Sequence, residues 1–117
     1  MKSLTLVALL FVLGGAPAFA DTATFKTGVG KIFTSDADFG GCMFGVSPGP
    51  ADAGLDCKNA FISLDCDGTY GAKDVAARKL SAVQLAYVTD QNVNVKADDS
   101  IKHNGYCVGV RIDNIKY

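Results

Sequence analysis

The sequence contains no tryptophan and no glutamate, and it has one histidine among its 117 residues. All twelve acidic residues are aspartates, which excludes acid or base catalysis by glutamate. A catalytic triad would have to be built around His103. The neighbouring segment 98–100 offers aspartates and a serine, but a loop tip rarely holds a nucleophile and its base rigidly enough. We therefore expect that the protein is not an enzyme.

A strong positive charge is also missing. Without Lys2, the chain has ten basic and twelve acidic side chains, which gives a formal net charge of −2. Proteins that bind nucleic acids by electrostatic attraction normally present a basic face. No nucleic-acid partner is expected.

The sequence has no pattern typical of a metal or cofactor site. Its four cysteines include no C-x-x-C pair, which argues against structural zinc. Asp98 and Asp99 lack the regular oxygen spacing of a calcium loop, and Lys102 stands in the same segment. No glycine-rich phosphate-binding pattern precedes a helix. We expect no metal and no cofactor.

The longest hydrophobic run stands at the amino terminus. Lys2 precedes uncharged apolar residues from Leu4 to Leu13, and small residues follow up to Ala18-Phe19-Ala20. This layout is typical of a secretory signal peptide with an A-x-A cleavage site. The run is shorter than the roughly 20 residues that a membrane span needs. We predict a signal peptide over residues 1–20, a single domain over 21–117, and a secreted or periplasmic location.

Four cysteines in an exported chain indicate two disulfides, because the compartments outside the cytoplasm are oxidising. Four cysteines can pair in three ways. Cys42 and Cys57 lie equally far from Gly49-Pro50, so a hairpin that turns there would place them opposite each other. This symmetry favours Cys42 with Cys57, which leaves Cys66 with Cys107.

The residue pattern predicts three strands, one helix and two further strands. The strands are runs of β-favouring residues bounded by glycine, proline and aspartate. In the helix, the apolar residues Ala76, Leu80, Val83 and Tyr87 recur at spacings of four, three and four, with Val75 beside them, which indicates one buried face. The expected strands are 27–34, 42–46, 59–66, 91–97 and 106–115, the expected helix is 73–89, and 98–105 is expected to be a polar loop.

The order β-β-β-α-β-β is that of the OB-fold, a five-stranded Greek-key barrel with a helix between its third and fourth strands. We therefore predict a mainly β protein with an OB-fold-like barrel. Element order alone does not fix the topology, so an α+β roll with a flat sheet is the alternative.

Several segments carry a resemblance to a known family. They are CMFGV from Cys42, CKNAFISLDC from Cys57 with its aromatic-x-Ser element at Phe61 and Ser63, QLAYVTDQ from Gln84 and NVNVK from Asn92. In this arrangement the chain resembles the binding subunits of AB5 toxins of the subtilase-cytotoxin type. The resemblance implies an exported, disulfide-containing OB-fold that forms ring pentamers and binds sialylated glycans. It also implies a toxin A subunit as a partner.

We accordingly expect a carbohydrate-binding, lectin-like subunit that recognises cell-surface glycans and assembles as a homo-oligomer. The alternative is a small secreted or periplasmic interaction module, an inhibitor or adaptor that binds a protein through the same surface.

The expected ligand site is the segment 98–106, because the loop between strands four and five of an OB-fold flanks its usual ligand face. The turn 36–41 flanks the same face. The aspartates of the first segment have an alternative role, in which they bond to loop amides, and its histidine is expected to be solvent-exposed. The candidate ligand residues are Asp36, Asp38, Asp99, His103, Asn104 and Tyr106.

Overall fold

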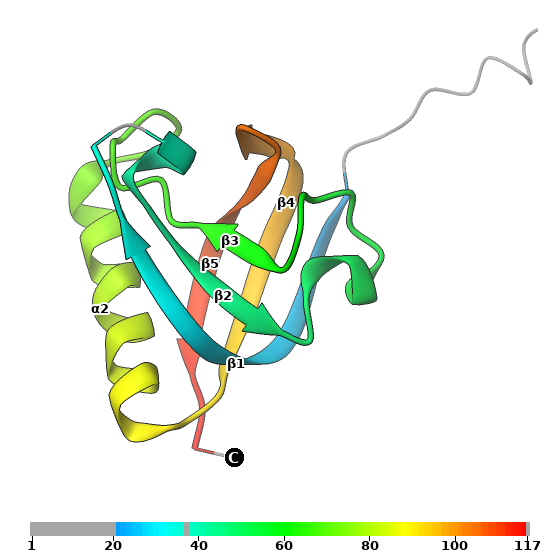
Figure 1. The fold of residues 1–117 in the computed structure, drawn as a ribbon, viewed down its shortest axis with the longest axis vertical. Helices are drawn as coiled ribbons and strands as arrows, with labels where there is room; N and C mark the ends of the chain where they lie inside the picture. Colours follow the sequence, from blue (N-terminus) through cyan, green and yellow to red (C-terminus); the bar gives the residue numbers. More distant parts are fainter. Residues whose placement is uncertain (1–20, 37, 117) are drawn as a thin grey trace, which may run out of the picture.

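The computed structural model describes residues 21–36 and 38–116. Within them the chain forms five strands, one α-helix and two short 3-10 helices, in the predicted order of strands and helix (Figure 1). The expected signal peptide, residues 1–20, lies outside the described residues. The bounds are β1 Thr22–Thr34, η1 Asp38–Gly41, β2 Cys42–Ser47, η2 Pro50–Ala53, β3 Phe61–Ser63, α2 Lys73–Thr89, β4 Val93–His103 and β5 Tyr106–Asn114.

The five strands close into a barrel in the order β1-β2-β3-β5-β4. The long strand β1 makes this closure possible, because its first half pairs with β4 and its second half pairs with β2. A register slip between Val29 and Lys31 marks a bulge in β1, and bulges let a strand bend. β3 and β5 run parallel and meet at Ser63 and Val108. The predicted OB-fold-like barrel is therefore confirmed, and the flat sheet of an α+β roll is wrong.

Side chains that point into the barrel form the hydrophobic core. Strands alternate their side chains between two faces, and the inward positions of β2, β3 and β4 are fully buried at Phe44, Ile62 and Val95. The helix adds Val83 and Ala86 to the same core. Burying a large apolar side chain stabilises a fold by roughly 1.5–3 kcal/mol. These residues therefore hold the helix and the barrel together.

The helix α2 packs against β1 and β5. Its bounds match the prediction, but its buried face is narrower than the sequence pattern indicated. Ala76, Val83 and Ala86 are buried, whereas Tyr87 is 52% and Val75 37% exposed. The apolar stripe is therefore wider than the contact with the barrel, and its margins at Val75 and Tyr87 face solvent. Among the described residues, no helix is both long and apolar enough to cross a membrane.

The described residues contain two disulfides, as predicted, but the predicted pairing is wrong. Cys42 is bonded to Cys66 and Cys57 to Cys107, with Cα–Cα distances of 5.6 Å and 5.4 Å. We had expected Cys42 with Cys57 and Cys66 with Cys107. Disulfides are typical of proteins in an oxidising compartment, which agrees with the expected export of this chain.

The pairing differs because the hairpin between β2 and β3 turns later than predicted. Phe44 lies opposite Ile62, so the connection is centred on Ala53. The helix η2 and the segment that follows it fill this connection. The shift brings Cys66, just after β3, beside Cys42 at the start of β2, and it leaves the other two cysteines to pair.

The segment 98–105, which we predicted to be a loop, is mostly strand. β4 continues to His103, and Asn104-Gly105 forms the turn to β5. The φ angles of these two residues are 53° and 88°, and a two-residue type I′ turn requires positive values at both positions. The register between β4 and β5 slips after Asp98, so that residues 99–101 bulge out of the ladder.

Candidate functional site

The outer side of the barrel carries four aromatic rings, from Phe33 on β1, Phe39 on η1, Phe61 on β3 and Tyr106 on β5. We call these four residues the aromatic face. Their rings form a closed cycle of tilted and edge-to-face contacts, with centroid distances of 5.4 Å to 6.4 Å. Each of the four residues is half-buried. The cluster therefore packs against the sheet on one side and meets solvent on the other.

The alternation of the strands explains why these rings point outward. Ile32 and Ile62 point into the core, so the adjacent Phe33 and Phe61 point away from it. Gly45 on β2 lies opposite Phe61, and a Cβ atom at this glycine would stand 3.2 Å from the Phe61 ring. The missing side chain lets the ring lie close against the sheet.

Two exposed lysines stand beside the aromatic face. The Lys31 Nζ lies 4.7 Å from the centroid of Phe33, and the Lys58 Nζ lies 5.1 Å from the centroid of Tyr106. The disulfide to β5 and a hydrogen bond from the Lys58 amide to the β4–β5 turn hold the backbone of the second lysine in place. An ammonium group is attracted to the face of an aromatic ring, and it can also pair with an acidic ligand.

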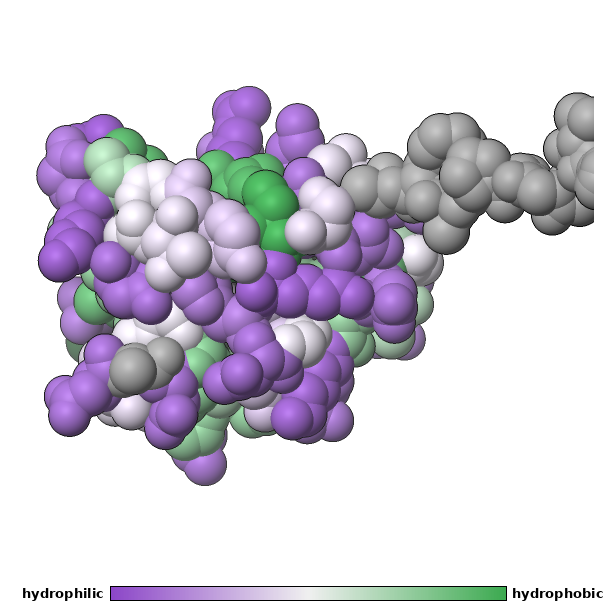
Figure 2. Space-filling view, turned by 90° about the horizontal axis from the view of Figure 1, so that it is seen from above, coloured by the Kyte–Doolittle hydropathy of each residue, from purple (hydrophilic) through white to green (hydrophobic). Residues whose placement is uncertain are grey.

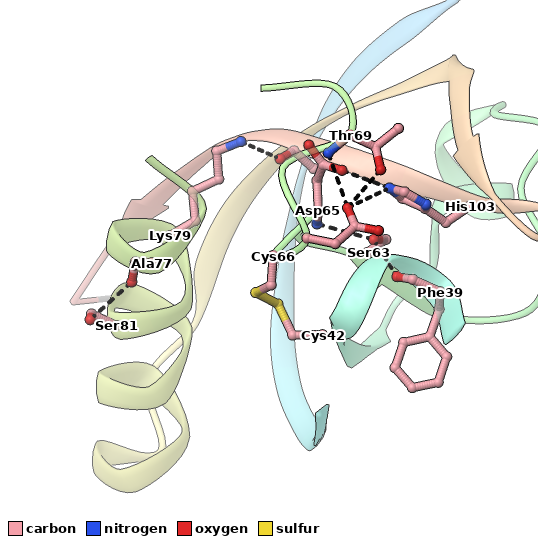
Figure 3. Close-up of a disulfide and its surroundings, with 12 residues drawn as sticks. Phe39, Cys42, Ser63, Asp65, Cys66, Thr69, Ala77, Lys79, Ser81 and His103 are labelled. Carbon is pink, nitrogen blue, oxygen red and sulfur yellow. Dashed lines mark hydrogen bonds and ion pairs between the residues drawn. A yellow bond between two sulfur atoms is a disulfide. The ribbon is translucent and has the colours of Figure 1, made fainter. Parts of the chain in front are cut away.

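The helix η1 presents Phe39 through a strained backbone. Phe39 has a φ angle of 43°, in the left-handed region that glycine favours. Its carbonyl oxygen accepts a hydrogen bond of 2.7 Å from the hydroxyl of the fully buried Ser63. The ring points away from this carbonyl and from the polar groups around it (Figure 3). Ser63 thus holds a conformation that exposes an aromatic ring, and backbone strain of this kind is concentrated at functional sites.

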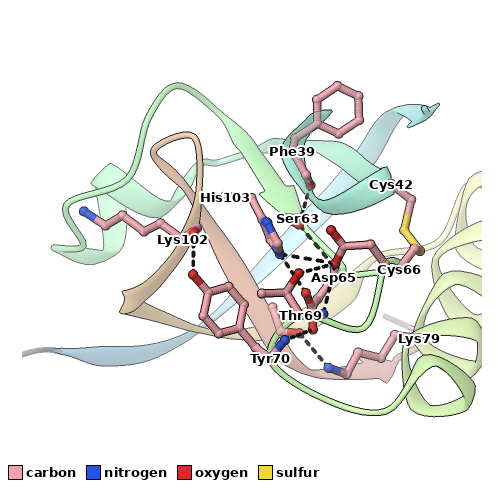
Figure 4. Close-up of polar contacts among 12 residues, drawn as sticks. Phe39, Cys42, Ser63, Asp65, Cys66, Thr69, Tyr70, Lys79, Lys102 and His103 are labelled. Carbon is pink, nitrogen blue, oxygen red and sulfur yellow. Dashed lines mark hydrogen bonds and ion pairs between the residues drawn. A yellow bond between two sulfur atoms is a disulfide. The ribbon is translucent and has the colours of Figure 1, made fainter. Parts of the chain in front are cut away.

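A polar cluster adjoins the aromatic face, and we define it as Ser63, Asp65, Asp67, Tyr70 and His103. Figure 4 shows Ser63, Asp65, Tyr70 and His103 together. The His103 Nε2 lies 2.6 Å from Asp65 Oδ1 and 3.7 Å from Asp67 Oδ1. The Tyr70 ring stands edge-on to the imidazole, with the centroids 5.0 Å apart. Figure 2 shows this end of the barrel from above, where hydrophobic surface is confined to small patches between hydrophilic side chains.

His103 is not the solvent-exposed loop histidine that we expected. Its side chain is 12% exposed, and that of its partner Asp65 is 6% exposed. The expectation is wrong because β4 continues to this residue and places it directly opposite Tyr106 on β5. The imidazole therefore lies over the outer side of the barrel, where the chain that leaves β3 covers it.

Hydrogen bonds favour the ionised form of Asp67. Thr69 donates its hydroxyl and its amide to Asp67 Oδ1 at 2.8 Å and 3.0 Å, which lowers the pKa of that carboxyl, and His103 adds a smaller effect in the same direction. Lys79 approaches the cluster from α2. Burial lowers the pKa of its ammonium group, and the carboxylate of Asp65 acts in the opposite direction.

Gly40 leaves the space that the imidazole occupies. Its φ angle is +81°, and a Cβ atom there would lie 2.5 Å from His103 Cδ2 and 2.8 Å from Ser63 Oγ. Its carbonyl oxygen accepts a hydrogen bond of 2.9 Å from the Asp67 amide. Gly40 thus joins the strained turn of η1 to the polar cluster.

The six candidate ligand residues have different positions. His103 and Tyr106 lie together on the outer side of the barrel, one in each cluster. Asp99 accepts hydrogen bonds from the backbone nitrogens of Asp21 and Asp56, at 2.8 Å and 3.2 Å, so it braces the structure as the alternative expectation proposed. The other three are exposed, with one in the β4–β5 turn and two at or just before η1, and they are Asn104, Asp36 and Asp38.

Sequence reasoning missed most residues of both clusters. Asp65 is 38 positions from His103 in the chain, and no local pattern indicates such a contact. A signal for the aromatic face was present, however. β1 and β3 each contain two adjacent large apolar residues, Ile32-Phe33 and Phe61-Ile62, where a strand with one wet face would alternate with polar residues.

Comparisons with known proteins add no relative. No family model, no curated protein and no solved structure matches the chain. The geometry of the two clusters therefore carries the functional argument.

Proposed function

We propose that this protein is an exported carbohydrate-binding protein whose ligand site is the aromatic face. The observation that carries the proposal is the closed cycle of four half-buried rings on the outer side of the barrel. The β1–β2 and β4–β5 connections border the rings, and these are the loops that flank the ligand face of OB-fold barrels, which bind oligosaccharides among other ligands.

The chemistry of the surroundings supports a sugar ligand. An aromatic ring offers a flat apolar surface to the C–H groups of a sugar, while polar groups nearby bind its hydroxyls. Tyr106 contributes such a hydroxyl, and Asn104 lies exposed in the adjacent turn. Lys31 and Lys58 supply positive charge at the edge of the face. This charge favours acidic glycans, the ligand class that the resemblance to subtilase-type binding subunits implies.

A glycan array with purified protein tests the proposal, with Phe61→Ala as the diagnostic variant. Truncation of an aromatic anchor at the centre of a binding site costs about 2 kcal/mol, which is roughly a thirtyfold loss of affinity. Lys26→Ala is the control, because Lys26 is exposed on β1 and belongs neither to the two clusters nor to α2. We expect the control to bind like the wild type.

Two results would contradict the proposal. One is an array on which the folded wild type binds no glycan, and the other is equal binding by wild type and Phe61→Ala. A variant that keeps the ring, Tyr106→Phe, guards against a folding defect and should lose only the contribution of its hydroxyl. A protein captured by the wild type but not by Phe61→Ala, together with a blank array, would favour the interaction module.

We also propose that the protein assembles as a homo-oligomer through α2. Val88 is 76% and Leu85 55% exposed, and Leu85 borders a hollow of about 630 Å³. Exposed apolar surface of this kind is typical of subunit contacts. Light scattering should report a mass several times that of one chain, and Val88→Asp should reduce it. A monomeric wild type that still binds glycan would contradict the proposed assembly but not the proposed carbohydrate binding.

A further inference from the structure

We propose that the polar cluster binds a divalent transition-metal ion, with His103, Asp65 and Asp67 as its protein ligands. One ligand atom from each of the three side chains lies within 4.8 Å of the other two. Both aspartates come from the segment that follows β3, and the histidine comes from the end of β4; Figure 4 shows Asp65 beside His103. The fold therefore places an imidazole beside two carboxylates, and no sequence motif predicts this arrangement.

The orientation of the imidazole supports the assignment. Its Nε2 faces both carboxylates, at 2.6 Å from Asp65 Oδ1 and 3.7 Å from Asp67 Oδ1. In a tetrahedral site with bonds of about 2.0–2.2 Å, neighbouring ligand atoms stand roughly 3.3–3.6 Å apart. Asp67 is already close to this spacing. Asp65 needs to withdraw by about 1 Å or less. The metal then replaces the proton between Nε2 and Asp65 Oδ1, and that proton moves to the imidazole Nδ1 or is released to solvent.

The ligands are held in place by other parts of the chain. Thr69 donates twice to Asp67 Oδ1, and the Tyr70 amide donates to Asp65 Oδ2 at 2.9 Å. The disulfide of Cys66 anchors the chain between the two aspartates. Outer partners of this kind orient metal ligands and raise the affinity of a site. The geometry therefore exists before any ion arrives.

The charges also suit a divalent cation. With a neutral imidazole, the carboxylates of Asp65 and Asp67 bring two negative charges to one place. The ammonium group of Lys79 acts on Asp65, but it donates its hydrogen bond to the carbonyl oxygen of Gly109 at 3.0 Å and stays outside the group of ligands. The side chain of Asp67 is 31% exposed, so an ion can enter from solvent.

The donor atoms select the class of metal. An imidazole nitrogen suits zinc, copper, nickel and iron, whereas calcium takes six to eight oxygen ligands and magnesium keeps most of its water. One nitrogen and two carboxylate oxygens leave at least one position open for water, as in zinc sites with three protein ligands. We therefore choose Zn²⁺ as the probe.

The chain has one histidine, so the ring signals of His103 can be assigned in an NMR spectrum without ambiguity. The experiment adds Zn²⁺ to untagged protein recovered from the periplasm of an expression host, since a histidine tag would itself bind zinc. We expect the ring signals to shift and to saturate at one ion per chain. Calorimetry on the same sample should give the same stoichiometry, and Ca²⁺ should have no effect at the same concentration.

Two variants and one control decide whether the three residues act together. Asp67→Asn keeps the acceptor for Thr69 but removes a charged ligand, and we expect it to weaken zinc binding by at least about tenfold. His103→Gln should weaken it at least as much. Asp36→Asn, a change at an exposed aspartate outside the cluster, should bind zinc like the wild type.

Unmoved ring signals in the wild type would overturn the proposal. So would a zinc affinity that Asp67→Asn leaves unchanged, because the histidine would then bind zinc without the cluster. If His103→Gln does not fold, the zinc affinity of Asp67→Asn alone still shows whether the cluster binds zinc. None of these measurements includes a glycan, so their failure would leave the proposed carbohydrate binding untouched.

Discussion

Gly40→Ala should destabilise the fold because it introduces a side chain where the polar cluster is packed most tightly. The new Cβ atom would lie 2.5 Å from His103 Cδ2, 2.8 Å from His103 Nε2 and 2.8 Å from Ser63 Oγ. The imidazole could rotate away, but it would then lose its hydrogen bond to Asp65 and press against Tyr70. Both the clash and the rotation of the imidazole would therefore destabilise the protein.

The expected loss of stability has two parts. The φ angle of +81° at Gly40 costs an alanine roughly 1–2 kcal/mol. Overpacking in a filled site costs typically about 1–3 kcal/mol more. We therefore expect the free energy of unfolding to fall by about 2–5 kcal/mol, which is a large fraction of the stability of a domain of this size.

Gly54→Ala separates the two parts. Gly54 has nearly the same φ angle, +85°, but a Cβ atom there meets nothing within 4 Å. This control should lose only the conformational part. Both variants and the wild type are compared by urea unfolding at equilibrium, and the difference between the variants measures the clash. If Gly40→Ala is no less stable than Gly54→Ala, the packing described for His103 is incorrect.

Three further outcomes are expected. Non-reducing peptide mapping should recover Cys57 joined to Cys107. Replacing both by alanine should lower the free energy of unfolding in urea by about 4 kcal/mol, because this bridge closes the longer loop of the two. A smaller loss than that caused by removing the other bridge would contradict the loop-entropy reasoning. Asp99 has a lowered pKa, chiefly because it accepts a hydrogen bond from the Asp21 nitrogen, so its contribution to stability is present above its ordinary pKa of 3.8 and is lost as the pH falls through the lower folded value. The difference in stability between wild type and Asp99→Asn should thus be constant near neutral pH and shrink below about pH 4, and a difference that grows in acid would reverse the sign of this argument. Val83→Ala, at a fully buried position of α2, should cost about 1–3 kcal/mol in thermal unfolding; an unchanged melting temperature would show that the helix does not pack on the barrel as described.

The candidate site could be predicted only in outline. The β4–β5 connection and the β1–β2 connection do flank one side of the barrel, and His103 and Tyr106 lie there. The prediction that His103 is exposed to solvent was wrong, because β4 extends through the segment 98–105, whose residues look like a polar loop. Phe39 reaches the site through a left-handed backbone that nothing in its neighbourhood along the chain predicts.

The sequence by itself determined the elements and their order. The residue pattern located part of each strand, although β1 begins at Thr22 rather than at residue 27 and β3 spans only Phe61–Ser63 rather than 59–66. Hydrophobic periodicity placed the helix at Lys73–Thr89 to the residue, because the period of apolar residues reflects the local geometry of the backbone. It also determined that four cysteines in an expected exported chain would form two disulfides.

The tertiary structure decided which elements meet and at what register. Cys42 pairs with Cys66 because the β2–β3 hairpin is centred on Ala53, and His103 meets Asp65 because barrel closure places the end of β4 over the end of β3. Periodicity specifies the face on which a residue lies, but it carries no information about the neighbour across that face. Contacts between residues far apart in the chain are fixed only when all strands pack at once, so the site emerges from the closed barrel and from no single segment.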